Sequence, residues 1–320
     1  MPDPSGGSAQ PGTAGKGVAL ALLSAGTFGT SGTFASALIS GGWSPAAVAV
    51  ARLGGAAVLL TVPAAVELRG RWALLRREAG RVVIYGLAIA CGQLFYFNAI
   101  ESIPIGLAVL LEYLGVVLVV GWLWVVRGQR PGVLTVAGAV AAIAGLAFVA
   151  DLARASQLSP IGIIWGLLEA VCLAAYFLFS AATGEAVLPP LVMAWGGLCL
   201  SAVFLAVAIG TGVLHITANA DDVELLHRGV SWIVPVLELS LVAAVIAYVA
   251  GIAAARRLGA RLASFTGIAE VFFAVLYAWL LLGQLPSLIT AANCCCSTTG
   301  LAGGRGTRRD GRSRWRSPRR

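Results

Sequence analysis

The apolar residues of this chain are grouped in long blocks instead of recurring at the short intervals of a soluble core. A hydrocarbon layer of roughly 30 Å needs about 20 apolar helical residues. Nine blocks of that length predict nine transmembrane helices, over residues 17–39, 44–66, 82–101, 104–124, 131–150, 160–182, 188–210, 232–254 and 262–283. Residues 1–16 are rich in Pro, Gly and Ser and predict a disordered lead, without the basic start and cleavage site of a signal peptide.

Composition supports the same fold class. Hydrophobic residues make up 59% of the chain and charged residues only 11%, whereas a soluble domain carries about 25% charged residues. So few charges could not cover the surface of a soluble protein, which argues against a soluble enzyme, a nucleic-acid-binding module or a disordered scaffold. We therefore expect an all-α, polytopic helical bundle in the membrane.

The formal net charge of +8 is not spread over this bundle. Residues 291–320 hold eight Arg and one Asp, while the remaining 290 residues hold 14 basic and 13 acidic groups. The basic character therefore belongs to the C-terminal tail, and the predicted bundle is almost neutral.

The charges of the short loops predict an orientation, because Lys and Arg are retained on the cytoplasmic side. With a cytoplasmic N-terminus, the outer side receives only Arg154 and Arg228, together with an acidic loop over residues 211–231. The cytoplasmic side receives Lys16, Arg69, Arg71, Arg76, Arg77, Arg81, Arg127, Arg130, Arg256, Arg257 and Arg261. We expect a multi-pass protein of the cell (inner) membrane with its N-terminus inside.

The two halves of the chain resemble each other. At an offset of 155 residues, Leu107-Ala108, Val116, Trp124, Gly128-Gln129 and Pro131 match Leu262-Ala263, Val271, Trp279, Gly283-Gln284 and Pro286. Earlier in the chain the offset is 145, and it matches Gly17, Leu22-Leu23, Ala25 and Pro45 to Gly162, Leu167-Leu168, Ala170 and Pro190. The longer loop at 211–231 accounts for the difference.

Five helices per copy is an odd number, so the second copy must have the opposite orientation in the membrane. The loop charges agree, since the Arg-rich segment 67–81 corresponds to the acidic loop 211–231. We expect a first repeat over residues 17–150 with five helices and a second, inverted repeat over 160–287 with four clear helices. Inverted repeats are typical of secondary transporters, whose substrate site lies near the midplane between the copies.

Two segments carry a family resemblance. They are residues 93–113, QLFYFNAIESIPIGLAVLLEY, and 257–286, RLGARLASFTGIAEVFFAVLYAWLLLGQLP. Both resemble the EamA-type transporters of the drug/metabolite transporter superfamily, and IPIGLAVLLEYLG is most similar to the branch with threonine/homoserine-type amino-acid exporters. The resemblance covers about residues 17–287 and implies a ten-helix inverted-repeat fold that exports or exchanges a small metabolite.

The chain departs from this family pattern in three places. Val116 stands where the family often has Pro, and Gln284 stands where it usually has Glu. The third departure is the tail, residues 288–320, which is polar and Arg-rich where a tenth helix is expected. We interpret it as the product of a frameshift or truncation, with a weak tenth helix followed by a basic tail, or a functional anion-binding tail, as alternatives.

Acidic side chains near the middle of the predicted helices are the main candidates for substrate binding or coupling. An ionisable group at the bilayer centre is costly, so it usually pairs, lines a cavity, or both. Counting along the helices places Glu112, Glu169 and Glu270 near the midplane, as it does Arg52, while Glu238 lies nearer the outer face. A carboxylate there can bind a substrate ammonium or take up a proton, although each can also serve packing alone.

Arg52 has two interpretations: an ion pair with one of these glutamates, which we favour, or a clamp on a substrate carboxylate. Facing Arg and Glu groups would then hold both ends of an amino acid, a hypothesis that fails if Arg52→Ala or Glu112→Gln transports normally. Hydrogen-bonding side chains on the predicted helices are further candidates, with interhelical contacts as their alternative role: Gln93, Tyr96, Asn98, Tyr113 and Tyr248.

The resulting prediction is a secondary transporter that exports a small polar metabolite by alternating access, with the lipid bilayer and that metabolite as its partners. One alternative is efflux of amphipathic drugs or cations through a cavity lined by Phe95, Tyr96, Phe97, Phe272 and Phe273. An integral-membrane enzyme is disfavoured because no His or Asp cluster occurs at a membrane interface. We expect no cofactor, no metal site and no nucleic-acid partner, since the cysteines and histidines lack ligand spacing and no Walker motif is present.

Overall fold

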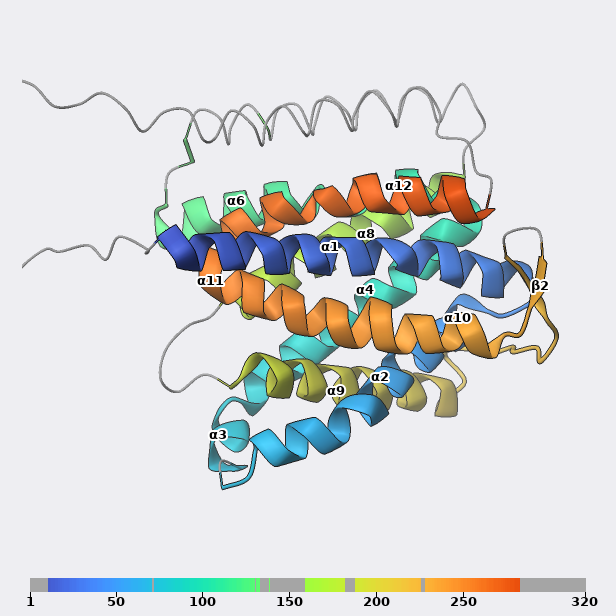
Figure 1. Cartoon of the computed structure of the whole chain (residues 1–320), viewed down its shortest axis with the longest axis horizontal. Helices are drawn as coiled ribbons and strands as arrows, with labels where there is room; N and C mark the ends of the chain where they lie inside the picture. Colours follow the sequence, from blue (N-terminus) through green and yellow to red (C-terminus); the bar gives the residue numbers. More distant parts are fainter. Residues whose placement is uncertain are drawn as a thin grey trace, which may run out of the picture.

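The computed structural model describes residues 11–70, 72–129, 131–132, 138, 159–181, 188–225 and 228–282. Its helices run roughly along one direction to form a bundle (Figure 1). In the first half they are α1 (Pro11–Ser40), α2 (Pro45–Glu67), α3 (Trp72–Arg77), α4 (Ala79–Ser102), α5 (Ile105–Glu112) and α6 (Gly115–Arg127). In the second half they are α8 (Pro160–Ser180), α9 (Pro190–Gly210), α10 (Ile233–Leu237), the π-helix η1 (Glu238–Ile246), α11 (Ala247–Gly267) and α12 (Ala269–Leu282).

Within these residues, seven helical stretches are long and apolar enough to cross a membrane, which confirms a polytopic helical bundle. They begin at Gly15, Pro45, Ala79, Ile105, Pro160, Pro190 and Ile233. The outward faces carry large apolar side chains, such as Val58 (74% exposed) and Val125 (82% exposed), as a lipid-facing surface requires. Apart from residues 131, 132 and 138, the predicted helix over 131–150 lies outside the described residues, as does the predicted tail at 288–320.

Three boundaries differ from the sequence prediction. Helix α1 begins at Pro11, earlier than the predicted start at residue 17. The predicted eighth helix continues beyond residue 254 as far as Gly259, where φ is 78° and ψ is 160°. Only glycine adopts that conformation without strain, so the chain turns there and the predicted ninth helix begins before residue 262.

The predicted fourth and ninth helices are each broken, at positions 155 residues apart. Val116 N–H donates to the Tyr113 carbonyl at 3.1 Å, and Val271 N–H donates to the Ile268 carbonyl at 3.0 Å. These i→i+3 bonds tighten one turn of each helix into 3₁₀ geometry, which often marks a hinge in a functional region. The break separates α5 from α6 in the first repeat and α11 from α12 in the second.

The packing of the helices follows the inverted repeat. Helix α1 packs mainly against α11 and α12, and its counterpart α8 packs mainly against α4, α5 and α6. At the start of α1, Gly17 lies against Leu258; at the start of α8, Gly162 lies against Ile103. These two contacts join residues that the sequence offsets pair with each other, which supports the predicted alignment of the copies.

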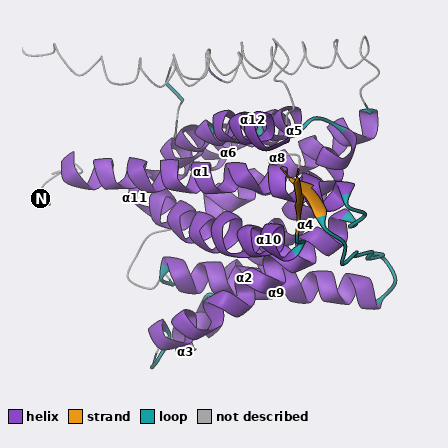
Figure 2. Ribbon diagram, turned by 45° about the vertical axis from the view of Figure 1, so that its right-hand side comes forward, coloured by secondary structure: helices purple, strands orange, loops and turns teal. Residues whose placement is uncertain are grey.

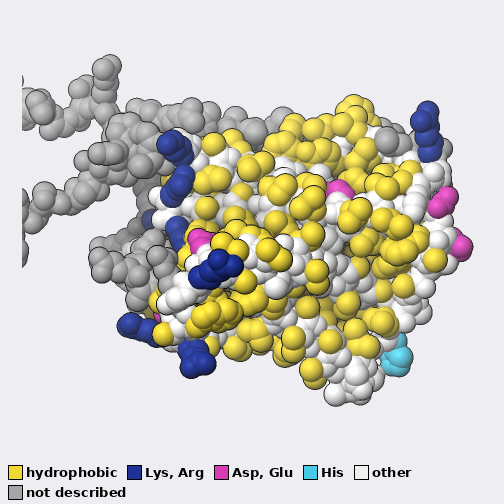
Figure 3. All heavy atoms as spheres, turned by 60° about the horizontal axis from the view of Figure 1, so that its bottom comes forward, with side chains coloured by type: hydrophobic (Ala, Val, Ile, Leu, Met, Phe, Trp, Pro, Cys, Tyr) yellow, Lys and Arg dark blue, Asp and Glu magenta, His cyan; other side chains and the backbone are white. Residues whose placement is uncertain are grey.

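The two ends of the bundle differ in charge and in structure. A hairpin of β1 (Val223–Leu225) and β2 (Arg228–Val230) covers one end, an element that the sequence did not predict (Figure 2). Val223 and Leu225 are buried, and Val223 lies against Gly41 at the end of α1. Lys and Arg side chains gather at the opposite end, beyond an apolar belt (Figure 3). We name these the hairpin end and the basic end.

Helix α6 approaches α8 so closely that a side chain at Gly115 has no room. A Cβ there would overlap the Ala170 carbonyl oxygen and press on Leu173. We expect Gly115→Ala to destabilise the protein by about 1–3 kcal/mol, the usual cost of overpacking, as a lower thermal-unfolding midpoint in detergent. Gly121→Ala in the same helix meets nothing within 4 Å and should leave that midpoint unchanged or slightly raised. Equal midpoints for the two variants would contradict the close contact.

Candidate functional site: a charged cavity between the two repeats

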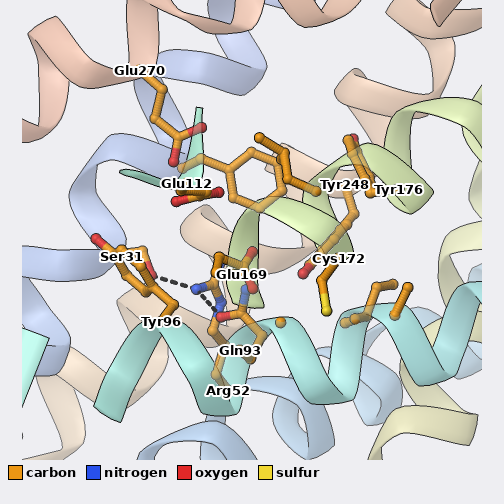
Figure 4. Close-up of a pocket in the computed structure, with 15 residues that line it drawn as sticks. Ser31, Arg52, Gln93, Tyr96, Glu112, Glu169, Cys172, Tyr176, Tyr248 and Glu270 are labelled. Atoms are coloured by element: carbon orange, nitrogen blue, oxygen red, sulfur yellow. Dashed lines mark hydrogen bonds between the residues drawn. The ribbon is translucent and has the colours of Figure 1, made fainter. Parts of the chain in front are cut away.

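A cavity lies in the middle of the bundle, between the two repeats. It contains about 490 Å³ of empty space, counting the part open to solvent. Helices α1, α2, α4 and α5 line it from the first repeat, and α8, α11 and α12 from the second. Its polar and aromatic lining is drawn in Figure 4. We name it the central cavity.

Arg52 of α2 is the positively charged group of this cavity, and only 1% of it is exposed. Its Nη1 donates to Gln93 Oε1 at 2.5 Å and to Ser31 Oγ, and its Nη2 donates to the Ala243 carbonyl at 2.5 Å. The last acceptor belongs to η1, where the π-helical turn replaces the usual α-helical hydrogen-bond pattern. The guanidinium is therefore held by three neutral oxygens from three different helices.

The favoured ion pair between Arg52 and a glutamate is wrong. In the part of the chain that the structure describes, the one ion pair within 4.0 Å joins Arg81 to Glu78. Instead, Arg52 lies near the rings of Phe28 and Phe97, with its Cζ atom 5.7 and 5.9 Å from the ring centroids. Sequence reasoning considered only charged partners, but neutral oxygens and aromatic faces together can stabilise a buried guanidinium.

Three glutamates line the central cavity from three helices: Glu112 of α5, Glu169 of α8 and Glu270 of α12. All are more than nine-tenths buried. Glu169 lies against Gly92 of α4, where a Cβ would crowd its carboxylate, and its Oε2 atom has no hydrogen-bond partner among the described residues. Glu112 is the last residue before the break that follows α5, and Glu270 comes directly after the matching break.

Glu270 also lines a second cavity on the basic side of the first. Tyr113 donates its hydroxyl hydrogen to Glu270 Oε2 at 2.8 Å, so residues beside the two helix breaks are joined across the repeats. The second cavity is bounded mostly by small side chains of α1 and α11, and it shares Phe28, Leu173, Tyr176 and Glu270 with the central cavity. We name it the basic-side cavity.

The predicted site residues meet as a group. Seven of them line the central cavity: Arg52, Gln93, Tyr96, Glu112, Glu169, Tyr248 and Glu270. Tyr113 lines the basic-side cavity instead. Asn98 does not contribute, because its Nδ2 donates to the Leu94 carbonyl of its own helix at 2.6 Å. A role of these residues in binding or coupling stays a prediction.

Sequence reasoning missed Phe28, Ser31 and Cys172 as lining residues and did not select Tyr176 as a site residue. The repeat offset pairs Ser31 with Tyr176 and Phe28 with Leu173; since neither counterpart was itself a predicted site residue, the offset could not have found them. The aromatic set of the efflux alternative was largely wrong. Of its five residues only Tyr96 lines the central cavity; Phe95 stacks on Trp165 and Phe272 is half exposed.

Comparison with known proteins identifies the architecture. The model of the EamA-like transporter family matches the chain twice, over residues 15–150 and 160–303. The chain belongs to the EamA-like transporter family. Its members are membrane transporters, and the two matches coincide with the two repeats. The second match extends beyond residue 287, where we predicted the second repeat to end.

A solved structure described as "Crystal structure of protein" has a TM-score of 0.64 and 20% sequence identity to the EamA-family chain. The match covers 92% of this chain and 97% of the solved one, so the likeness concerns the whole fold. No curated protein matches the sequence significantly.

The Tyr113–Glu270 hydrogen bond gives a direct test of how the two breaks are joined in this EamA-family protein. Because a typical hydrogen bond contributes about 0.5–1.5 kcal/mol to stability, we expect Tyr113→Phe to lower the thermal-unfolding midpoint measurably. Tyr277→Phe is the control, since the ring of Tyr277 stacks on Phe273 and its hydroxyl has no hydrogen bond with any of the described residues. If Tyr113→Phe unfolds at the midpoint of the control, the bond contributes nothing to stability.

Proposed function

We propose that this EamA-family protein is a secondary transporter that exports a small polar metabolite by alternating access, with a threonine/homoserine-type amino acid as the first candidate. The observation that carries the proposal is the central cavity itself. It is lined by both repeats and contains three buried carboxyl groups, none of which forms an ion pair within 4.0 Å in the described part of the chain. Buried ionisable groups in a membrane bundle are costly and typically belong to a substrate or ion pathway.

The charge distribution supports an orientation with the N-terminus in the cytoplasm. Lys and Arg side chains gather at the basic end, and the acidic residues of the loop 211–231 belong to the hairpin end (Figure 3). The positive-inside rule then assigns the basic end to the cytoplasm and the hairpin end to the outside of the inner membrane. In this orientation the basic-side cavity lies between the cytoplasm and the central cavity.

The contacts at the hairpin end fit the closed side of such a transporter. Ser44 and Thr217 exchange two hydrogen bonds, of 2.9 and 3.1 Å, and Trp43 Nε1 donates to the Asn219 carbonyl at 2.7 Å. These bonds tie the outer loop to the junction of α1 and α2. Opening this side would require them to break, while the helix breaks beside Tyr113 and Ile268 supply matched bending points in the two repeats.

The three glutamates also offer a means of proton coupling. A carboxylate that faces a cavity in a membrane bundle can alternate between protonated and ionised forms as access changes from one side to the other. Export against a substrate gradient would then draw on inward proton movement. Exchange without proton coupling is the alternative, and the response to an imposed pH gradient distinguishes the two.

Efflux of amphipathic cations or drugs is the second candidate. The observation in its favour is the aromatic lining of the central cavity, formed by Phe28, Tyr96, Tyr176 and Tyr248. This lining differs from the aromatic set predicted from the sequence. Aromatic faces attract organic cations. The apolar surface that they provide would suit a substrate larger than threonine.

Uptake into everted membrane vesicles tests the proposed function. Vesicles from cells that produce the protein, and matched vesicles without it, are given a panel of radiolabelled amino acids under an imposed pH gradient. We expect gradient-driven accumulation of at least one amino acid only where the protein is present. Absence of such flux for every amino acid would contradict amino-acid export and favour cation efflux.

The proposed orientation predicts a labelling pattern. We expect a cysteine introduced in place of His215, in the exposed loop at the hairpin end, to react in whole cells with a maleimide that cannot cross membranes. A cysteine in place of Arg76, at the basic end, should react only after the membrane is opened. Both positions are exposed in the structure, whereas the native cysteines in the described helices are only partly exposed. The reverse pattern would place the N-terminus outside.

A further inference from the structure

The hydrogen bond between Tyr113 and Glu270 occurs once, although the repeat offers two equivalent places for it. The offset of 155 residues pairs Tyr113 with Ile268 and Gly115 with Glu270. Ile268 and Gly115 have no side-chain groups that could form the same bond, so a single link joins the two helix breaks. Two identical inverted copies would give states open to either side with equal free energy, because each copy would take the place of the other. A link that is present in one direction only distinguishes the two states.

The backbone leaves room for this link. A Cβ at Gly267 would lie 3.0 Å from the Tyr113 hydroxyl oxygen, so the glycine allows the tyrosine to reach Glu270. Tyr113 is the C-cap residue of α5, and Glu270 is the second residue of α12. The bond therefore ties the end of one broken helix to the start of the segment that follows the other break.

Glu270 is also the one carboxyl group, among the described residues, that lines both cavities. Glu112 and Glu169 line the central cavity alone. The basic-side cavity contains about 340 Å³ of empty space, counting the part open to solvent, and in the proposed orientation it lies between the cytoplasm and the central cavity. A proton bound to Glu270 can therefore leave toward the cytoplasm without passing a substrate in the central cavity.

Two hydroxyl groups lie next to each other in the lining of the basic-side cavity. The Tyr176 hydroxyl is buried without a hydrogen-bond partner among the described residues, and Ser24 Oγ donates to the Ala247 carbonyl at 2.9 Å. A Cβ at Gly251 would overlap the Tyr176 hydroxyl and lie 2.8 Å from Ser24 Oγ, so this glycine leaves space for both. A hydroxyl with unused hydrogen-bonding capacity can bind water, which carries protons. The basic-side cavity thus has polar groups along the path that a proton from Glu270 would take.

The groups around Glu270 supply too little positive charge for every carboxyl group to be ionised. Glu270 forms no ion pair within 4.0 Å in the described part of the chain, and α1, which packs most extensively against α12, contributes no titratable side chain to either cavity. Besides Tyr113, the titratable groups that line the cavities with Glu270 are one guanidinium, two carboxyl groups, one thiol and three phenols: Arg52, Glu112, Glu169, Cys172, Tyr96, Tyr176 and Tyr248. An ionised carboxylate buried without a counter-charge is strongly disfavoured. We therefore expect at least one of the three carboxyl groups to bind a proton.

We propose that Glu270 binds the coupling proton and that the Tyr113–Glu270 bond transmits its charge state to the two helix breaks. A hydrogen bond to an ionised carboxylate is roughly twice as strong as one between neutral groups, so the link is strong while Glu270 is ionised and weak once it is protonated. One proton binds to the Glu270 carboxylate through the central cavity while the outer side is open, and it leaves through the basic-side cavity to the cytoplasm. Glu169 stays available for the substrate. The inference rests on the proposed transport function and names the residue that couples it to protons.

Two modes of transport separate proton coupling from substrate binding. The purified full-length protein is placed in proteoliposomes, with radiolabelled threonine as the probe. The first mode is accumulation driven by an imposed pH gradient. The second is exchange of labelled for unlabelled threonine without a gradient, which needs substrate binding and alternating access but no net proton movement.

We expect Glu270→Gln, which keeps an acceptor for Tyr113 and cannot titrate, to lose gradient-driven accumulation at least about tenfold and to retain exchange. Retained exchange also shows that this variant is folded. Glu169→Gln should lose both modes, and Glu238→Gln should lose neither. Tyr113→Phe should keep both modes but shift the pH profile of accumulation to higher pH, because the lost bond favours the ionised carboxylate. Tyr277→Phe should leave that profile unchanged.

Accumulation by Glu270→Gln at the rate of the unaltered protein would overturn the inference. Loss of both modes in this variant would also overturn it, because Glu270 would then serve substrate binding or folding. An unchanged pH profile in Tyr113→Phe would reject transmission through the bond. The proposed function is judged on the unaltered protein: threonine exchange without a response to the gradient rejects proton coupling and leaves the transporter standing, whereas the absence of both modes contradicts threonine transport and the inference with it.

Discussion

Replacing Glu169 with glutamine should reduce export about 100-fold while leaving the protein folded. The substitution keeps the shape of the side chain and removes one negative charge from the central cavity. An attraction of about 3 kcal/mol between an ammonium and a carboxylate is a moderate value for a partly buried pair, and it corresponds to roughly a 100-fold change in binding. Because the buried Oε2 atom has no hydrogen-bond partner among the described residues, we expect the thermal-unfolding midpoint not to fall.

The measurement is the initial rate of gradient-driven uptake into everted vesicles, normalised to the amount of protein. Glu238→Gln is the matched control: it makes the same chemical change in the membrane bundle, outside the lining of either cavity. We expect the control to transport within about twofold of the unaltered protein. Unchanged export by Glu169→Gln, or an equal loss in the control, would contradict a role for Glu169 in the substrate path.

Replacing Arg52 with methionine should mainly lower the stability of the protein, because it removes hydrogen bonds that join several helices. Methionine is of similar length but leaves Ser31, Gln93 and the Ala243 carbonyl without their donor. Since a hydrogen bond from a charged group contributes about 1.5–3 kcal/mol and such contributions are not additive, we expect a total loss of at least about 3 kcal/mol. The thermal-unfolding midpoint in detergent should fall by several degrees.

Arg127→Met is the control for this prediction, since Arg127 is an exposed residue at the end of α6. Arg52→Lys provides a second comparison. It keeps the charge but can reach fewer acceptors at once, so its midpoint should lie between those of Arg52→Met and the unaltered protein. Equal midpoints for Arg52→Met and Arg127→Met would show that the buried guanidinium contributes nothing to the fold.

The architecture could be predicted from the sequence because the membrane imposes simple rules. Apolar blocks of about 20 residues must form helices there, since a lipid-exposed backbone has to satisfy its own hydrogen bonds. The repeat offsets gave the pairing of the halves, and the contacts of Gly17 with Leu258 and of Gly162 with Ile103 support it. Counting along the predicted helices likewise selected Glu112, Glu169 and Glu270 as candidates, and the structure places all three at the central cavity.

The local departures could not be predicted in the same way. The hairpin at Val223–Val230 contains only two three-residue strands, which are too short for a periodic pattern. The break near Tyr113 involves no proline or positive-φ residue and is visible only in its i→i+3 bonds. The early start of α1 at Pro11 and the turn at Gly259 also depend on contacts with neighbouring helices.

The sequence by itself determined that the chain is a membrane protein built from two repeats with a nearly neutral body, and it predicted the inverted orientation of the copies and which ionisable residues lie at mid-depth. These properties follow from hydropathy, spacing and loop charge, which act one segment at a time. Only the tertiary structure decided what those residues touch. Arg52 is held by a serine, a glutamine and a backbone carbonyl, the last 191 residues away, and Tyr113 pairs with Glu270 across 157. Partners so distant in the chain depend on how the helices pack, and a hydrogen bond between them leaves no periodic trace in the sequence.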